Sequence, residues 1–148
     1  MKYVLKSEWK PIQFSTHPRT ALRQRKLAQI IKSSGGEVLI SYHTQTRIRQ
    51  NEILRIVQTM ELRGADLAKV VTHTFNVDDL MNFLRTISKV KNSVRIPFNL
   101  MNFGAYSIPG RLLSVAFGSA WVYCRTGSRV FAGQPTIQQA RTFLDDLQ

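Results

Sequence analysis

The sequence predicts an α/β fold in which parallel β-strands alternate with α-helices. Residues 67–72 are mostly aliphatic and contain one lysine, and an apolar run without polar alternation is typical of a parallel strand covered on both faces. Residues 50–63 repeat apolar side chains every three or four positions, which indicates a helix. Strand and helix segments follow one another about five times. This order fits either a doubly wound sheet or part of a (β/α) barrel.

The first half of the chain contains β-rich segments separated by glycines, prolines and one further helical pattern. Gly35 and Gly36 end that helix, and Gly64 ends the helix described above. Two prolines, Pro11 and Pro18, predict a loop near the N-terminus. The expected elements are a strand over 2–9, a loop over 10–18, a helix over 19–33, a strand over 37–43, a loop over 44–49, a helix over 50–63 and a strand over 67–72.

Two capping patterns mark helices in the second half of the chain. Asn76 precedes a helical segment with Asp78 and Asp79 in its first turn, where acidic side chains favour the helix dipole. Thr136 has Gln139 three residues later, as in a capping box. The expected elements are a helix over 77–90, a strand over 94–100, a loop over 102–110, a helix over 111–117, a strand over 120–123, a loop over 125–135 and a last helix after Thr136.

The length of 148 residues predicts one domain over 1–148, with 1–19 as a lead-in strand and loop. No apolar run is long enough to span a membrane, and the N-terminus is too polar for a signal peptide. The single cysteine, Cys124, excludes a disulfide framework within the chain, and no Cys/His spacing resembles a zinc site. We therefore expect a cytoplasmic protein without a metal.

The formal net charge is +12, and residues 1–36 carry eight lysines and arginines but one acid, Glu8. A basic surface attracts nucleic acid, anionic lipid or a small anionic substrate, although such a face is often only solvated. Trp9, Phe14 and His17 lie near these basic residues, but their spacing matches no RNA-binding or zinc-finger motif. Nucleic acid is therefore the least favoured partner.

Four polar residues fall at or after the expected strand ends, where parallel α/β folds place their functional groups. His43 ends one strand, Lys69 lies near the end of the next, Arg111 follows the loop after residues 94–100, and Gln134 lies in the loop after the last strand. A desolvated lysine has a lowered pKa, and its neutral amine attacks carbonyl carbon. A neighbouring histidine can move the proton of the adjacent carbon.

Arg111 is suited to hold a carboxylate by a bidentate contact. The alternative for Lys69 is that its amine reaches water at the strand end, and each of the other residues taken alone fits a solvated surface position.

Several segments resemble the type I 3-dehydroquinate dehydratases, in the same order and at similar spacing over about residues 20–148. The similar segments are VLISYH (38–43), GADLAKVV (64–71), GRL (110–112), FGSA (117–120) and AGQPT (132–136). The resemblance implies dehydration of 3-dehydroquinate to 3-dehydroshikimate, in the shikimate pathway, without metal or organic cofactor. It further implies that Lys69 forms the imine, that His43 is the general acid/base, and that Arg111 and Gln134 contact the substrate.

The sequence departs from this family at several positions. Thr44 stands where the family has an acidic residue, Gly110 where it has a serine, and Val130 where it has a substrate-binding serine. The family's methionine-rich strand is only partly kept in residues 100–103.

The family is a (β/α)₈ barrel, which typically needs about 250 residues. The chain resembles the fourth to eighth strands only, so we expect a partial barrel. Such a barrel has open strand edges, and a homo-oligomer or a partner chain is expected to cover them. The alternative function is a catalytically inactive barrel remnant that acts as a binding or assembly module.

Overall fold

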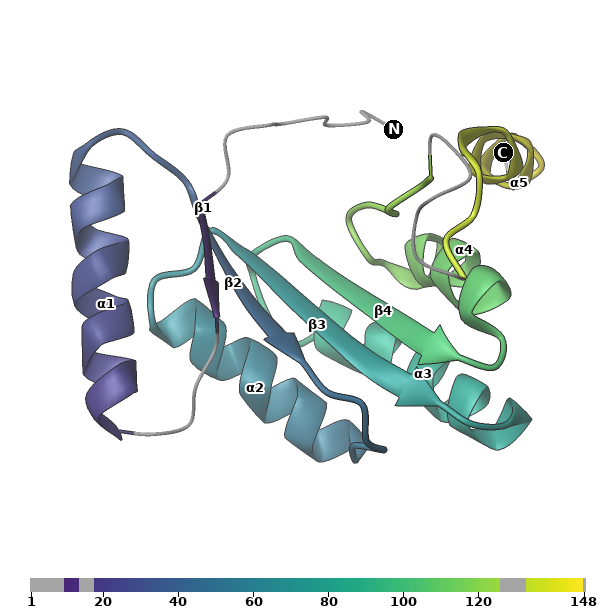
Figure 1. Ribbon diagram of the computed structural model, residues 1–148, viewed down its shortest axis with the longest axis horizontal. Helices are drawn as coiled ribbons and strands as arrows, with labels where there is room; N and C mark the ends of the chain where they lie inside the picture. Colours follow the sequence, from purple (N-terminus) through teal and green to yellow (C-terminus); the bar gives the residue numbers. More distant parts are fainter. Residues whose placement is uncertain (1–9, 14–17, 126–132, 148) are drawn as a thin grey trace.

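The computed structural model describes residues 10–13, 18–125 and 133–147 (Figure 1). Within these ranges the strands and helices alternate along the chain up to α4. The elements are β1 (Lys10–Gln13), α1 (Pro18–Ser33), β2 (Val38–His43), α2 (Gln50–Leu62), β3 (Leu67–Thr74), α3 (Val77–Lys91), β4 (Phe98–Gly104), α4 (Ser107–Phe117) and α5 (Ile137–Asp145). The predicted strand over 2–9 and Val130 lie outside the described residues.

The four strands of the described residues form one sheet in the order β1-β2-β3-β4, and every neighbouring pair is parallel. A helix connects each strand to the next, and such crossovers are right-handed in nearly all proteins, so successive helices cover the same face of the sheet. Figure 1 shows α2 and α3 running along the sheet. The α/β prediction is therefore confirmed.

The helix-covered face of the sheet contains the hydrophobic core. Alternate strand residues point to this face because side chains along a strand alternate with a period of two. The buried cluster joins Val38, Ile40, Ala68, Val70, Phe98 and Leu100 of the strands to apolar residues of α2 and α3. The intervening strand residues, which include Lys69, therefore point to the opposite face.

The predicted loop over 10–18 is wrong for residues 10–13, which form β1. Its partner is β2, and the pairing aligns Ile12 with Ile40. Pro11 has no N–H group to donate, which restricts proline to edge positions of a sheet, and β1 is an edge strand of the described sheet. Pro11 therefore lies in an edge strand rather than a loop, whereas Pro18 begins α1.

The predicted strand over 94–100 and the loop after it are displaced in the structure, because β4 extends from Phe98 to Gly104. Asn102 looked like the start of a loop, yet its side chain is fully buried, and its Nδ2 donates to Thr74 Oγ1 at 2.9 Å. A buried amide is tolerated in a strand when it is hydrogen-bonded. The polar residue therefore continues the strand instead of ending it.

The helix predicted over 111–117 begins four residues earlier, at Ser107. Pro109 lies in its first turn, where the backbone N–H groups have no acceptor inside the helix, so a proline is tolerated. Gly110 packs against Asn102, and a Cβ at this glycine would lie 2.4 Å from Asn102 Oδ1. The glycine therefore permits close packing of α4 on β4.

The strand predicted over 120–123 is not formed. In the described part of this region, the strand-type contact is an isolated bridge between Arg125 and Thr136. The segment nevertheless lies beside β4, because the Ala120 N–H donates to Phe98 O at 2.8 Å. One hydrogen bond of this kind positions the chain without making a ladder.

The predicted helix caps are confirmed. The Asn76 side chain accepts a hydrogen bond from the Asp79 N–H, and Thr136 and Gln139 form a reciprocal capping box. None of the helices in the described ranges is long and apolar enough to cross a membrane.

We expect Met60→Ala to lower the free energy of unfolding by about 2–5 kcal/mol, because the side chain is fully buried under the sheet and its loss leaves a cavity. The matched control is Met81→Ala on α3, where the side chain is 44% exposed and the cost should stay below about 0.5 kcal/mol. Urea unfolding monitored by circular dichroism measures both values. Equal losses in the two variants would contradict the core assignment.

Candidate active site

The sheet face opposite the helices carries a row of polar side chains. The parallel register places Ser41 of β2, Lys69 of β3 and Asn99 of β4 at one level. Paired residues of a parallel sheet point to the same face, so these three side chains are neighbours. His43 is paired with Val71 and therefore lies on the same face, one row closer to the carboxyl ends of the strands.

Lys69 is half-buried, and its Nζ lies 4.9 Å from the ring centroid of Tyr123. No carboxylate of the described residues lies within ion-pair distance of this amine. Burial and, to a smaller extent, the positive charge of Arg111 lower the pKa of Lys69 below its usual value. A lowered pKa increases the fraction of neutral, nucleophilic amine at neutral pH.

His43 lies at the exposed end of β2. The residues around the imidazole displace water, and this desolvation lowers the pKa of His43, with a further lowering from the charge on Lys69. The two side chains are therefore close enough to influence each other. A neutral imidazole at neutral pH can accept a proton, as a general base must.

Arg111 projects from α4 and is only 1% exposed. Its Nε donates to Asn102 O at 3.2 Å, and its Cζ lies 5.2 Å from the ring centroid of Phe103. Burial lowers the pKa of Arg111. Because its charge reaches Lys69, the structure brings Lys69, His43 and Arg111 into one electrostatic neighbourhood.

Gln134 lies in the loop before α5, and its Oε1 is buried without a hydrogen-bond partner among the described residues. The preceding Gly133 has a φ of +90° and packs directly on Ser107 at the start of α4. The loop is therefore held beside α4, the helix that carries Arg111. Among the described residues, no hydrogen bond joins Gln134 to Lys69 or His43.

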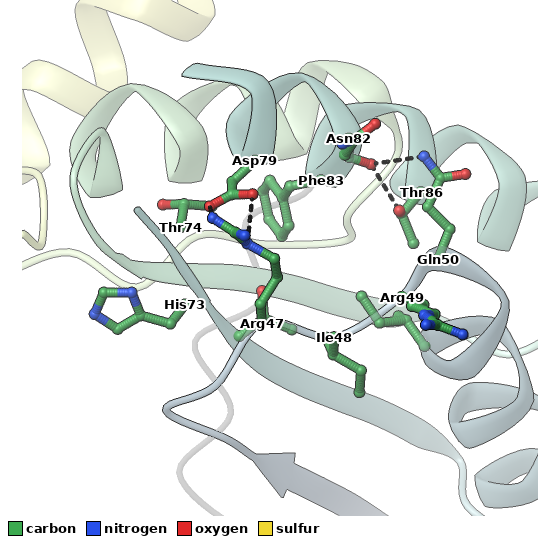
Figure 2. Close-up of a pocket in the computed structure, with 12 residues that line it drawn as sticks. Arg47, Ile48, Arg49, Gln50, His73, Thr74, Asp79, Asn82, Phe83 and Thr86 are labelled. Carbon is green, nitrogen blue, oxygen red and sulfur yellow. Dashed lines mark hydrogen bonds and ion pairs between the residues drawn. The ribbon is translucent and has the colours of Figure 1, made fainter. Parts of the chain in front are cut away.

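A cavity of about 410 Å³ lies elsewhere, between the 44–49 loop, the end of β3 and α3 (Figure 2). Arg47 forms an ion pair with Asp79 at 2.9 Å, and Gln50 Nε2 donates to Asn82 O. These contacts tie the loop and α2 to α3, as the dashed lines in Figure 2 show. None of the four candidate residues lines this cavity, so it is separate from the candidate site.

Two residues of the site were missed in the sequence. Tyr123 lies in the segment that was expected to be a strand, and nothing in its spacing indicated a contact with Lys69. Asn99 is fully buried beside Lys69, and its Nδ2 donates to Trp121 O. A polar residue inside an apolar run was the available signal for Asn99, as it was for Lys69.

The described ranges contain no group of three or more His, Cys, Asp or Glu side chains arranged to hold a metal ion.

We expect Lys69→Met to raise the pKa of His43, because the substitution removes a positive charge that disfavours imidazolium. The pKa should remain below the usual value for a histidine, since burial is the larger cause of the lowering. NMR titration of the His43 ring protons measures the shift. Lys26→Met on the exposed face of α1 is the control and should leave the pKa of His43 unchanged. An unchanged or lower pKa of His43 in Lys69→Met would show that the charge of Lys69 does not act on the imidazole.

The chain is similar to proteins of one family. A family model described as type I 3-dehydroquinase matches residues 18–148. The 3-dehydroquinate dehydratase of Aromatoleum aromaticum is 33% identical over 89 residues, which are 60% of this chain and 34% of the relative. That of Albidiferax ferrireducens is 35% identical over 86 residues, which are 57% of this chain and 32% of the relative. The matched regions span about a third of the length of these relatives.

Solved structures agree with the fold. The 3-dehydroquinate dehydratase of Geobacillus kaustophilus superposes with a TM-score of 0.86 at 22% identity, covering 95% of this chain and 54% of that one. The Clostridium difficile enzyme gives a TM-score of 0.83 at 20% identity, covering 95% and 55% of the two chains. The chain thus has the fold of about half of these proteins, which confirms the predicted partial (β/α) barrel. Since the family model matches most of the chain, this protein belongs to the type I 3-dehydroquinase family.

Proposed function

We propose that the protein dehydrates 3-dehydroquinate to 3-dehydroshikimate through a Schiff base on Lys69, in the shikimate pathway and in the cytoplasm. The observation that carries the proposal is a half-buried lysine with a lowered pKa beside His43, in a chain of this family. Both curated relatives named above are 3-dehydroquinate dehydratases. The chain covers only part of those relatives, so activity in this chain is the point to test.

The chemistry divides between two residues. The neutral Lys69 amine adds to the ketone carbon, and loss of water gives a protonated imine. His43 then removes a proton from the carbon adjacent to the imine and gives it to the hydroxyl group on the next carbon, which leaves as water. Hydrolysis of the imine returns the lysine, so the net reaction releases one water from the substrate.

Arg111 and Gln134 are proposed as substrate contacts. Arg111 is suited to the substrate carboxylate because its buried guanidinium has no ion-pair partner among the described carboxylates. The buried Oε1 of Gln134 lacks a partner among the described residues and could accept a hydrogen bond from a substrate hydroxyl.

We expect borohydride reduction in the presence of 3-dehydroquinate to add the mass of the reduced product at Lys69, and we expect Lys69→Ala to abolish this adduct. The reason is that only a neutral amine next to an acid/base group forms the imine readily at neutral pH. Peptide mass spectrometry locates the adduct. Lys26→Ala, at an exposed lysine, should leave the adduct unchanged, and labelling confined to surface lysines would count against the proposal.

The alternative is an inactive partial barrel that serves as a binding or assembly module. The observation that favours it is the partial coverage of the relatives. Absence of a Lys69 adduct in a folded protein that still associates would favour this alternative.

We also propose that the protein self-associates through α1 and the edge of the sheet. Leu22 and Ile30 of α1 are 59% and 62% exposed, and Leu27 is also exposed. In the described residues β1 pairs with β2 alone, and Figure 1 shows α1 at one end of the molecule beside it. Exposed apolar side chains on a helix next to the edge strand of the described sheet are suited to a protein partner.

We expect sedimentation at micromolar concentration to show a dimer or larger species, and Ile30→Glu to shift it toward monomer because a charge would be buried in the contact. Met81→Glu on α3 is the matched control at an exposed apolar position. Higher salt should strengthen association, because the exposed Arg23, Arg25 and Lys26 of α1 repel their counterparts in a second copy. A stable wild-type monomer would refute this proposal, whereas binding to nucleic acid would weaken with salt.

A further inference from the structure

The Nζ of Lys69 lies over the ring of Tyr123, 4.9 Å from the ring centroid. We propose that Tyr123 is a positioning residue that holds the Lys69 cation against its ring face and stabilises the protonated imine formed at the same nitrogen. The part that concerns the imine rests on the proposed function. The part that concerns the free lysine does not.

The segment that carries Tyr123 is fixed to the sheet at several points. The Leu100 N–H donates to Ser119 Oγ at 3.1 Å, and the Ala120 N–H donates to Phe98 O at 2.8 Å. Asn99, the register neighbour of Lys69, donates through Nδ2 to Trp121 O. These bonds hold the backbone before Tyr123 against β4, close to the level of Lys69.

Two further contacts hold the backbone after Tyr123 and the ring of Tyr123 itself. The Arg125 N–H donates to Pro135 O at 2.9 Å. The ring of Trp121 packs edge-on against that of Tyr123, with centroids 6.3 Å apart and an interplanar angle of 72°. Edge-on packing leaves a face of the Tyr123 ring for Lys69. Because the backbone is held before and after Tyr123 and its ring packs on Trp121, the ring loses little further conformational entropy when the lysine packs on it.

The surroundings of Lys69 explain why such a ring is needed. No described carboxylate forms an ion pair with the lysine, and the nearby Arg111 is positively charged. Burial and Arg111 both disfavour the cation. The negative face of an aromatic ring favours a cation within about 6 Å, and it does so without neutralising the net charge of a site that is to receive an anionic substrate.

The same contact applies to the reaction intermediate. The neutral amine, a ketone and one proton combine to give an iminium ion and one water, so the positive charge ends on the former Nζ. A ring face that stabilises the ammonium therefore also stabilises the iminium, whereas the neutral amine gains much less. The ring is expected to raise the pKa of Lys69 against the opposite effect of burial.

The first test compares Tyr123→Phe with Tyr123→Leu and needs no substrate. The rate of acetic anhydride labelling at Lys69 is followed against pH by peptide mass spectrometry, with Lys26 and Lys89 as internal controls. Tyr123→Leu should shift the midpoint down by roughly 0.5–1 pH unit, and Tyr123→Phe should leave it within about 0.2, because the ring face is kept. No shift, or an upward shift because water enters, would overturn the proposal.

A second series keeps the shape of the residue, so that it remains informative if Tyr123→Leu does not fold. Phenylalanine with one, three or five ring fluorines at position 123 weakens the negative ring face stepwise at nearly constant size. The midpoint for Lys69 should fall in that order, and a midpoint independent of fluorination would overturn the proposal.

Borohydride trapping with 3-dehydroquinate in the same series tests the part that concerns the imine. The yield of adduct at fixed pH should decrease as fluorination increases, after correction for the fraction of neutral amine. An unchanged yield would overturn this part. Absence of any adduct in the wild-type protein would reject the proposed function, while the labelling midpoints would still decide whether the ring holds the lysine.

Discussion

The parallel register of β2, β3 and β4 is the constraint on which the rest of the site depends. It sets Ser41, Lys69 and Asn99 side by side, with His43 one row further along. A slip of one residue would turn each side chain to the other face, because the side-chain period of a strand is two. Lys69 would then point into the apolar core between the sheet and the helices, where its charge would have no partner.

The register is itself secured by the helix-covered face. Val70 and Leu100 pack with the buried residues of α2 and α3, and in the other alternation Lys69 and Asn99 would take their places in this apolar core. The apolar core thus decides the orientation of the polar row, although the two lie on opposite faces. The apolar packing on one face of the sheet and the polar row on the other are consequences of the same alternation.

The electrostatics of the site are dominated by positive charge. Arg111 is buried and Lys69 is half-buried, and the charge of Lys69 lowers the pKa of His43. Among the described residues, Arg111 contacts the backbone carbonyl of Asn102 and the ring of Phe103. Lys69 contacts the ring of Tyr123, and neither cation is paired with a described carboxylate. Such partners make cations tolerable but leave the site net positive, and an anionic ligand would complete it.

The cavity beside Asp79 is separate from the candidate site, because none of the four candidate residues lines it. Its arginine is already paired with a carboxylate, and its role is to tie the loop after β2 to α3. That loop begins directly after His43, so the ion pair supports the end of the strand that presents the imidazole.

The sequence by itself determined the features that depend on local periodicity and local caps. The helices near residues 19–33, 50–63 and 77–90 follow from spacing within each segment, and the caps at Asn76 and Thr136 are hydrogen bonds over three residues. Lys69 and His43 were also visible, because a polar residue in or at the end of an aliphatic run is conspicuous.

Tertiary structure decided the features that depend on partners far along the chain. The extent of β4 requires Thr74 to satisfy the buried Asn102, and β1 is a strand because β2 lies beside it. The segment around Tyr123 looked like a strand, but hydrogen bonds to β4 and to Pro135 hold it without a ladder and bring its ring to Lys69. Such contacts join segments separated by tens of residues, and only the folded chain brings those segments together.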